Sequence, residues 1–244
     1  IIRNRNGWQN VVLGINGFLL LGLVVFLAIA PRDPEHDREE EPPTLRRLSS
    51  LPRELWITAL SWLLFTTGMM SVFTFGASFL AEQGYDYGRA SFEIGLLMWI
   101  AVPGSIIAGW IIDRWGSLRA HIFLFGAGTG AGLLAFALGG HPTSLMILVG
   151  FLGSFTPIAI YAVPGMIVKP HRLGLAFGVI LTFANIGNTV GPVLTGWITT
   201  LTDSYGSGMI VIALLLFCSA GCAVFMRSHR LAIRANPATG EGSV

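Results

Sequence analysis

The stretch AGWIIDRWGSLRAH, residues 108–121, decides the fold of this chain. An apolar run precedes it, Asp113, Arg114 and Arg119 gather around Gly116, and the sequence that follows is apolar again. Charges confined to a short turn between two apolar runs are typical of a loop that joins two membrane-spanning helices. The stretch therefore predicts a turn at a membrane surface.

The composition agrees with a membrane protein. Hydrophobic residues make up 53% of the 244 residues and charged residues only 11%, whereas soluble domains carry roughly 25% charged residues. The net charge of +2 gives no reason to expect a nucleic-acid partner. Cys218 and Cys222 lie four residues apart in an apolar run, too far along a helix for an easy disulfide, and are expected to be reduced.

Seven apolar segments are long enough to cross a bilayer as helices, since a span needs about 20 residues. They are residues 8–30, 56–80, 94–112, 121–140, 145–168, 173–200 and 209–226. Residues 31–55 are rich in charge and proline and are expected to form a hydrated linker. Residues 227–244 are expected to form a tail, so the chain divides into 1–30, 31–55, 56–226 and 227–244.

The basic residues outside the spans predict an orientation, because Lys and Arg concentrate on the cytoplasmic side. Alternating the seven spans puts Arg3, Arg5 and Arg89 on one side and twelve basic residues on the other. These twelve are Arg32, Arg38, Arg46, Arg47, Arg53, Arg114, Arg119, Lys169, Arg172, Arg227, Arg230 and Arg234. We therefore expect the N-terminus outside, the C-terminus in the cytoplasm, and a location in the bacterial inner membrane.

A short repeat links the third and sixth spans. Gly104 is followed by the motif GWI at 109–111, and Gly191 is followed by GWI at 196–198, so the two copies are offset by 87 residues. An odd number of spans separates the copies, which places them in opposite directions across the bilayer. Inverted three-helix repeats are characteristic of secondary transporters, and spans two to four and five to seven would form the two repeats.

The charged turn within residues 108–121 resembles the Gly-x-x-x-Asp-Arg-x-Gly loop of the major facilitator superfamily. The matching positions are Gly109, Asp113, Arg114 and Gly116. The match departs from the family pattern where Ile112 replaces a small residue and where the basic residue is displaced to Arg119, which suits the weaker loop of the second half. The sequence GWQNVVLGINGFLLLG, residues 7–22, resembles the family's sixth helix.

This resemblance implies an all-α membrane fold. Span one would be the family's sixth helix, residues 31–55 the central cytoplasmic linker, and spans two to seven the C-terminal six-helix half. The chain begins at Ile1 without an initiator Met, and we expect it to be a fragment that acts with a missing N-terminal half. The implied activity is secondary transport of a small solute by alternating access, in the lipid bilayer and without a cofactor or metal.

The resemblance also implies a gating role for the turn, with Gly109, Asp113, Arg114, Gly116 and Arg119 as its residues. We expect Asp113 to lie just past the end of one helix, where its carboxylate can accept hydrogen bonds from the N–H groups of the next helix or pair with Arg. Gly109 would allow a close helix contact and Gly116 the reversal of the chain. The alternative is a turn that only fixes topology.

Polar and aromatic residues inside the spans are the candidates for contact with a solute. Asn and Thr side chains on one helix face serve either helix packing or a water-filled cavity. Pro157 and Pro164 are expected to break the backbone ladder of span five. The cavity candidates are Thr66, Met70, Thr74, Trp99, Ser154, Tyr161, Thr182, Asn185, Asn188 and Thr189.

Glu93, at the outer start of the third predicted span, is the carboxylate expected to reach into the bilayer. A buried carboxylate can carry a coupling proton, and Glu93 is the candidate for that role. The alternative places Glu93 in the first turn of its helix, where an acidic residue stabilises the N-terminus.

Other classes of seven-span protein fit the sequence less well. A retinal protein needs a Lys in a late span, but the single lysine, Lys169, lies in a predicted cytoplasmic loop. An enzyme is not expected, because no His lies near mid-span to activate a Ser and no H-E-x-x-H motif occurs. A receptor-like or channel protein without a transport cycle remains the alternative.

The sixth span, GLAFGVILTFANIGNTVGP at 174–192, loosely resembles the cyanate and nitrate-type carriers of the superfamily and equally its general bacterial carriers. The first resemblance favours a small anion as the substrate. No Arg lies inside any predicted span, so we expect the countercharge for an anion to come from the missing half.

Overall fold

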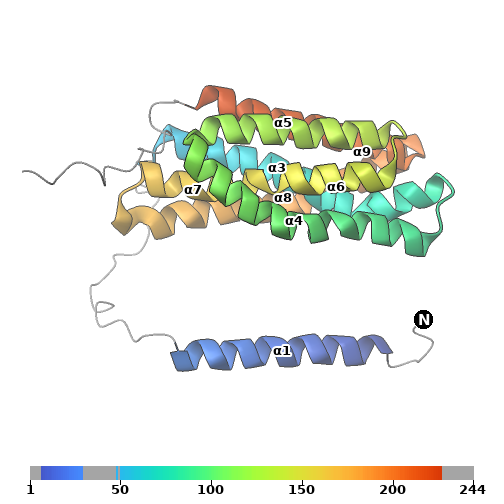
Figure 1. The fold of residues 1–244 in the computed structure, drawn as a ribbon, viewed down its shortest axis with the longest axis horizontal. Helices are drawn as coiled ribbons and strands as arrows, with labels where there is room; N and C mark the ends of the chain where they lie inside the picture. The colour runs from blue at the N-terminus through green and yellow to red at the C-terminus, as the bar shows by residue number, and fades with distance from the viewer. Residues whose placement is uncertain (1–6, 30–47, 49, 227–244) are drawn as a thin grey trace, which may run out of the picture. The chain divides into compact units, whose positions relative to one another are not determined.

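Figure 1 shows the computed structural model of the chain, which describes residues 7–29, 48 and 50–226. The chain divides into two compact units, Ile1–Pro42 and Pro43–Val244. Helix α1 (Gly7–Ile29) is the described part of the first unit. Most of the predicted linker and the whole of the predicted tail lie outside the described residues.

The described part of the second unit is a bundle of helices (Figure 1). Its helices are α3 (Arg53–Glu82), α4 (Tyr87–Trp115), α5 (Leu118–Ala137), α6 (Pro142–Gly153), α7 (Phe155–Ile167), α8 (Leu173–Thr202) and α9 (Tyr205–Cys222), with short 3₁₀ turns at Pro170–Arg172 and Ala223–Phe225. Together with α1, they form seven segments that are long and apolar enough to cross a membrane. The predicted all-α fold with seven spans is confirmed.

Several helices extend beyond the predicted spans because polar caps, rather than loss of hydrophobicity, set their ends. α4 begins at Tyr87 instead of residue 94, since the Asp86 side chain accepts hydrogen bonds from Gly88 N and Arg89 N at 2.9 and 3.3 Å. α9 begins at Tyr205 instead of residue 209, where Ser204 Oγ accepts from Gly206 N at 3.1 Å. Both caps satisfy N–H groups that a helix start leaves without partners.

The fifth span consists of two helices, α6 and α7, which meet at Ser154. Pro157 explains the break, because it lacks the N–H group that would donate to the Gly153 carbonyl four residues earlier. Ser154 Oγ donates to Phe151 O at 2.7 Å and so satisfies one carbonyl at the end of α6. Pro164 lies inside α7 without ending it. The predicted break is therefore confirmed at Pro157 and not at Pro164.

The two copies of the repeat make matching contacts in the bundle. A Cβ atom added to Gly104 of α4 would lie 2.5 Å from Ser154 Oγ, and one added to Gly191 of α8 would meet the Thr67 carbonyl of α3. Adding the offset of 87 to Gly104 gives 191, and adding it to Thr67 gives 154. Each glycine therefore packs against the first span of the other repeat, which confirms the inverted repeat.

Polar side chains buried inside the bundle join α3 to the last two helices. Ser61 Oγ donates to Ser219 O at 2.9 Å, and Ser219 Oγ donates to Ser61 O at 2.7 Å. Thr66 Oγ1 lies 3.3 Å from Ala184 O of α8. Small residues and interhelical hydrogen bonds of this kind stabilise helix packing in a bilayer. α3 is thereby fixed between α8 and α9.

Candidate functional site

One face of α8 carries polar side chains outward. Thr182, Asn185 and Thr189 are exposed, Asn188 is half-buried, and a Cβ added to Gly178 would meet nothing within 4 Å. The opposite face of α8, with Gly187 and Gly191, packs tightly on α3. We call the four residues Gly178, Thr182, Asn185 and Thr189 the polar stripe.

The hydrogen bonds of the polar stripe engage most of its side-chain donors within α8. Thr182 Oγ1 donates to Gly178 O at 2.8 Å, Thr189 Oγ1 donates to Asn185 O at 2.9 Å, and Asn185 Nδ2 donates to Leu181 O at 2.9 Å. These donors are engaged within the helix, so the stripe mainly presents oxygen acceptors. An amide exposed to lipid is costly, which indicates that this face meets water or another protein.

The remaining cavity candidates divide into exposed and buried groups. Thr74 and Met70 of α3 are exposed, Trp99 of α4 is 76% exposed, and Tyr161 of α7 is 36% exposed. Thr66 and Ser154 are buried in helix contacts, with their hydroxyls bonded to backbone carbonyls. The structure thus places these two in packing positions rather than on an open surface.

Tyr161 belongs to an aromatic cluster with Trp62 and Phe177. Its ring packs edge-on against Trp62 with centroids 5.5 Å apart and stacks with Phe177 at 6.5 Å. Trp62 is buried, and its Nε1–H has no hydrogen-bond partner among the described residues. Sequence periodicity gave no signal for this cluster, because its members come from α3, α7 and α8.

The exposed face of α4 is apolar along most of its length and ends in a charge. Phe92, Trp99, Ile106 and Trp110 follow one another at helical spacing and are all exposed, and Asp113 continues the same face. This face is unlike the polar stripe of α8, although α4 and α8 are equivalent helices of the repeat.

The turn after α4 differs from the predicted geometry. Asp113 lies inside α4, which continues to Trp115, and Ser117 rather than Asp113 caps α5 by accepting from Ala120 N at 3.4 Å. No hydrogen bond or ion pair reaches the Asp113 carboxylate from the described residues. The predicted role of Asp113 as a cap for α5 is therefore wrong, and its carboxylate points outward from the bundle.

The structure also shows the surroundings of the other residues predicted for the turn. Gly116 has φ +66°, the left-handed conformation that ends α4, as predicted for a reversal. Nothing lies within 4 Å of a Cβ added to Gly109, so this glycine makes no close helix contact inside the described bundle. The Arg114 guanidinium lies 5.7 Å from the centre of the Trp110 ring, and Arg119 lies in the first turn of α5.

Sequence reasoning missed His121, which follows the turn. His121 is buried, its Nδ1 lies 2.7 Å from Ser117 O, and its ring stacks on Phe125 with centroids 5.7 Å apart. Its Nε2 has no partner among the described residues. The position of His121 at the edge of an apolar span gave no indication of these contacts.

Glu93 is buried between α4 and α6. Its Oε1 accepts a hydrogen bond from Thr143 Oγ1 at 2.9 Å and lies 3.7 Å from Arg89 Nε, whereas Oε2 has no hydrogen-bond partner among the described residues. α4 begins at Tyr87, so Glu93 lies in the second turn. The alternative interpretation of Glu93 as a first-turn helix charge is wrong, because Asp86 already caps this helix.

Comparison with known proteins finds relatives that are named as transporters. The family model of the Major Facilitator Superfamily matches residues 1–149. The chain is 26% identical to the gentisate transporter of Corynebacterium glutamicum and 23% identical to human monocarboxylate transporter 11. These alignments cover 88% and 86% of the chain but only 51% and 48% of the two relatives, so the chain spans about half of their length.

A solved structure supports the same fold. The peptide transporter POT, an E310Q mutant in complex with sulfate, superimposes with a TM-score of 0.60 over 73% of this chain and 38% of that protein, at 21% identity. The family match covers more than half of the chain and agrees with the inverted repeat and the seven helices. The chain therefore belongs to the Major Facilitator Superfamily.

Proposed function

We propose that this bundle is one half of a secondary transporter and works by alternating access with a second six-helix bundle. The polar stripe of α8 carries this proposal, because exposed Asn185 and its neighbouring threonines need water or protein beside them. In transporters built from repeats, substrates bind near the bilayer midplane between such units. That relatives are about twice as long as this chain is in keeping with a second bundle.

We propose that the substrate is a small organic anion. The relatives include proteins named for monocarboxylates, gentisate and tartrate, the last a putative transporter of Agrobacterium vitis at 28% identity. These names favour a carboxylate over the cyanate or nitrate suggested by the sixth span. The polar stripe offers acceptors and no cation, so the countercharge for the carboxylate would come from the second bundle.

The Asp113 carboxylate is the proposed gating group. It lies in the last turn of α4, where the partial negative charge of the helix end disfavours an anion. A cation or a helix N-terminus of the second bundle would relieve this unfavourable position when the two bundles close. Arg114, held over Trp110, and Arg119 would then position the turn rather than pair with Asp113.

Glu93 is the proposed proton-coupling group. Glu93 is buried, its Oε2 has no hydrogen-bond partner among the described residues, and its Oε1 lies 3.7 Å from Arg89 Nε, so a movement of Arg89 would leave this carboxylate without a charged partner. Arg89 of α4 is the titratable group that the structure places beside Glu93, and His141 is the N-cap residue of α6, the helix that carries Thr143. We expect Glu93→Gln to abolish stimulation of uptake by an inward proton gradient while leaving exchange of substrate across the membrane intact.

The proposed orientation places the turn after α4 in the cytoplasm. The start of α3, this turn, and the segment between α7 and α8 lie at one end of the bundle (Figure 1). Arg53, Arg114, Arg119, Lys169 and Arg172 are at that end, which the rule for Lys and Arg assigns to the cytoplasm. Cysteines at Gln83 and His171, in a variant without Cys218 and Cys222, should react from outside and from inside, respectively.

Uptake by the reconstituted full-length protein tests the proposed function. Proteoliposomes should accumulate a labelled monocarboxylate or aromatic carboxylate with saturable kinetics, and an excess of unlabelled carboxylate should compete. An uncharged amide of the same acid should not compete. Lack of saturable uptake or exchange for every organic anion in such a panel would rule out the proposed substrate class.

A further inference from the structure

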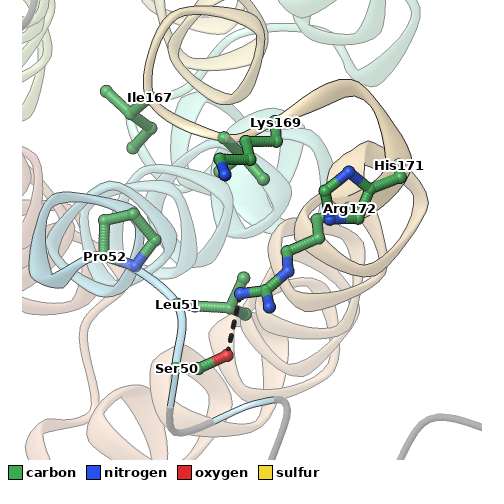
Figure 2. Close-up of a pocket in the computed structure, with 8 residues that line it drawn as sticks. Ser50, Leu51, Pro52, Ile167, Lys169, His171 and Arg172 are labelled. Atoms are coloured by element: carbon green, nitrogen blue, oxygen red, sulfur yellow. Dashed lines mark hydrogen bonds between the residues drawn. The ribbon is translucent and has the colours of Figure 1, made fainter.

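A small cavity lies at the same end of the bundle as the turn after α4, and basic side chains line part of it (Figure 2). Its volume is about 190 Å³, and it lies between the segment that precedes α3 and the segment that joins α7 to α8. Leu51, Pro52, Ile167 and Val168 form the apolar part of its lining; Ser50, Lys169, His171 and Arg172 form the polar part. The cavity is large enough for several water molecules, since one water molecule occupies ~30 Å³.

The positive charge of this cavity is not balanced within the described bundle. Arg172 Nη1 donates to Ser50 Oγ at 3.0 Å, and no described carboxylate pairs with Lys169, His171 or Arg172. Glu54, the acidic residue in the first turn of α3, is buried and does not line the cavity. Arg172 therefore keeps most of its five N–H donors for a ligand.

The backbone adds to this positive potential. α3 and α8 both begin at the cavity, and neither helix start has a side-chain cap at Pro52 or Arg172. The starts of two 30-residue helices, with the partial positive charge of their helix dipoles, thus lie at the same cavity as the three basic side chains. Helix starts alone do not define a site, but here they flank a cavity that already holds the basic cluster.

We propose that this cavity binds a phosphate group, either the headgroup of an anionic phospholipid or a soluble phosphate. A tetrahedral oxyanion can accept from the Arg172 guanidinium and the Lys169 ammonium at once. The apolar lining beside these donors fits the first carbons of a lipid. Basic pockets between spans at the membrane surface bind phospholipid headgroups in this way.

The single lysine of the chain gives a direct probe of occupancy. The full-length protein is placed in nanodiscs of phosphatidylcholine, with or without phosphatidylglycerol, and acetylated briefly. Peptide mass spectrometry then measures the rate of acetylation at Lys169. A bound phosphate should slow this rate by about tenfold or more, given the attraction of anionic lipid to each nearby cation.

Two variants that each lose one positive charge distinguish a specific phosphate site from general electrostatic attraction of anionic lipid to this end of the bundle. Arg172→Gln should abolish the protection of Lys169, whereas Arg119→Gln, which removes a cation from the first turn of α5 at the same end of the bundle, should preserve it. Ser50→Ala removes the oxygen that accepts from Arg172 Nη1 without changing the charge, and should weaken the protection because the guanidinium is held less firmly. Size-exclusion profiles of the variants check that the protein stays folded.

The source of the phosphate follows from two arms of the experiment. Protection by phosphatidylglycerol that millimolar inorganic phosphate does not reproduce would support a lipid headgroup. Protection by inorganic phosphate in pure phosphatidylcholine would support a soluble ligand. Absence of protection in both arms, or equal loss of protection in Arg119→Gln and Arg172→Gln, would overturn the proposal.

Discussion

α4 and α8 are equivalent helices of the inverted repeat, and they agree in packing but not in exposed surface. Gly104 and Gly191 contact residues of the other repeat that are themselves equivalent. Outside this contact, Asn185 and Thr189 of α8 correspond to Met98 and Val102 of α4, all of them exposed. The packing contact is thus common to both copies, whereas the outward faces differ, and this difference supports the proposed binding role of α8.

The largest effect is expected from a substitution that disrupts the common packing contact. Gly191→Ala would press a methyl group against the Thr67 backbone carbonyl, which cannot move without α3, whereas Gly104→Ala meets the Ser154 hydroxyl, which can rotate. Overpacking costs about 1–3 kcal/mol, so we expect Gly191→Ala to lower the thermal unfolding temperature in detergent clearly more than Gly104→Ala.

Gly178→Ala provides the control for this comparison, because its methyl group would enter open space. It should leave stability within about 0.5 kcal/mol of the original protein. Equal losses in Gly104→Ala and Gly191→Ala would show that the two contacts are equally rigid and that Ser154 cannot adapt.

The next effect concerns the charged end of α4. In the full-length protein, Asp113→Asn should reduce transport more than Arg119→Ala. A charge-assisted hydrogen bond contributes about 1.5–3 kcal/mol, enough to shift a two-state access equilibrium by about tenfold. We expect faster alkylation of a cysteine placed at Gly174, near the start of α8, because the gate would open more often.

Thr200 is the equivalent of Asp113 in the second copy, since 113 plus 87 is 200. Thr200 Oγ1 donates to Gly196 O at 2.8 Å within its own helix, so Thr200→Val should transport nearly normally. If the Asp113→Asn protein transports normally, and if its cysteine at position 174 is alkylated at the rate of the original protein, the turn fixes topology only.

The smallest effect tests the exposed faces themselves. Asn185→Met replaces the amide with the residue of the equivalent position on α4, and should lower kcat/KM for uptake by about two- to tenfold, the value of one neutral hydrogen bond between the amide and an uncharged group of the substrate or a water molecule. Met98→Leu on α4 keeps an apolar face and should have no measurable effect. A similar loss in both variants would remove the functional distinction between the two faces.

The sequence predicted the spans, the repeat, the break at Pro157 and the reversal at Gly116, because each depends on hydrophobicity or on a single residue with a fixed backbone preference. It misplaced Asp113 and the environment of Glu93, since helices continue past the hydrocarbon region until a cap or a glycine ends them. It could not separate buried Thr66 and Ser154 from exposed Thr182, because periodicity assigns a face to each residue but not the neighbour that covers it.

The hydrogen bonds between Ser61 and Ser219 have a consequence for how the protein is made. These residues are 158 positions apart, and at a synthesis rate of about 5–20 residues per second α3 waits on the order of ten seconds or more for α9. During that interval the Ser61 hydroxyl and Gly68 face lipid or the insertion machinery without their partners on α9. The nascent chain is therefore expected to need a protected site beside the ribosome until its last helix has entered the membrane.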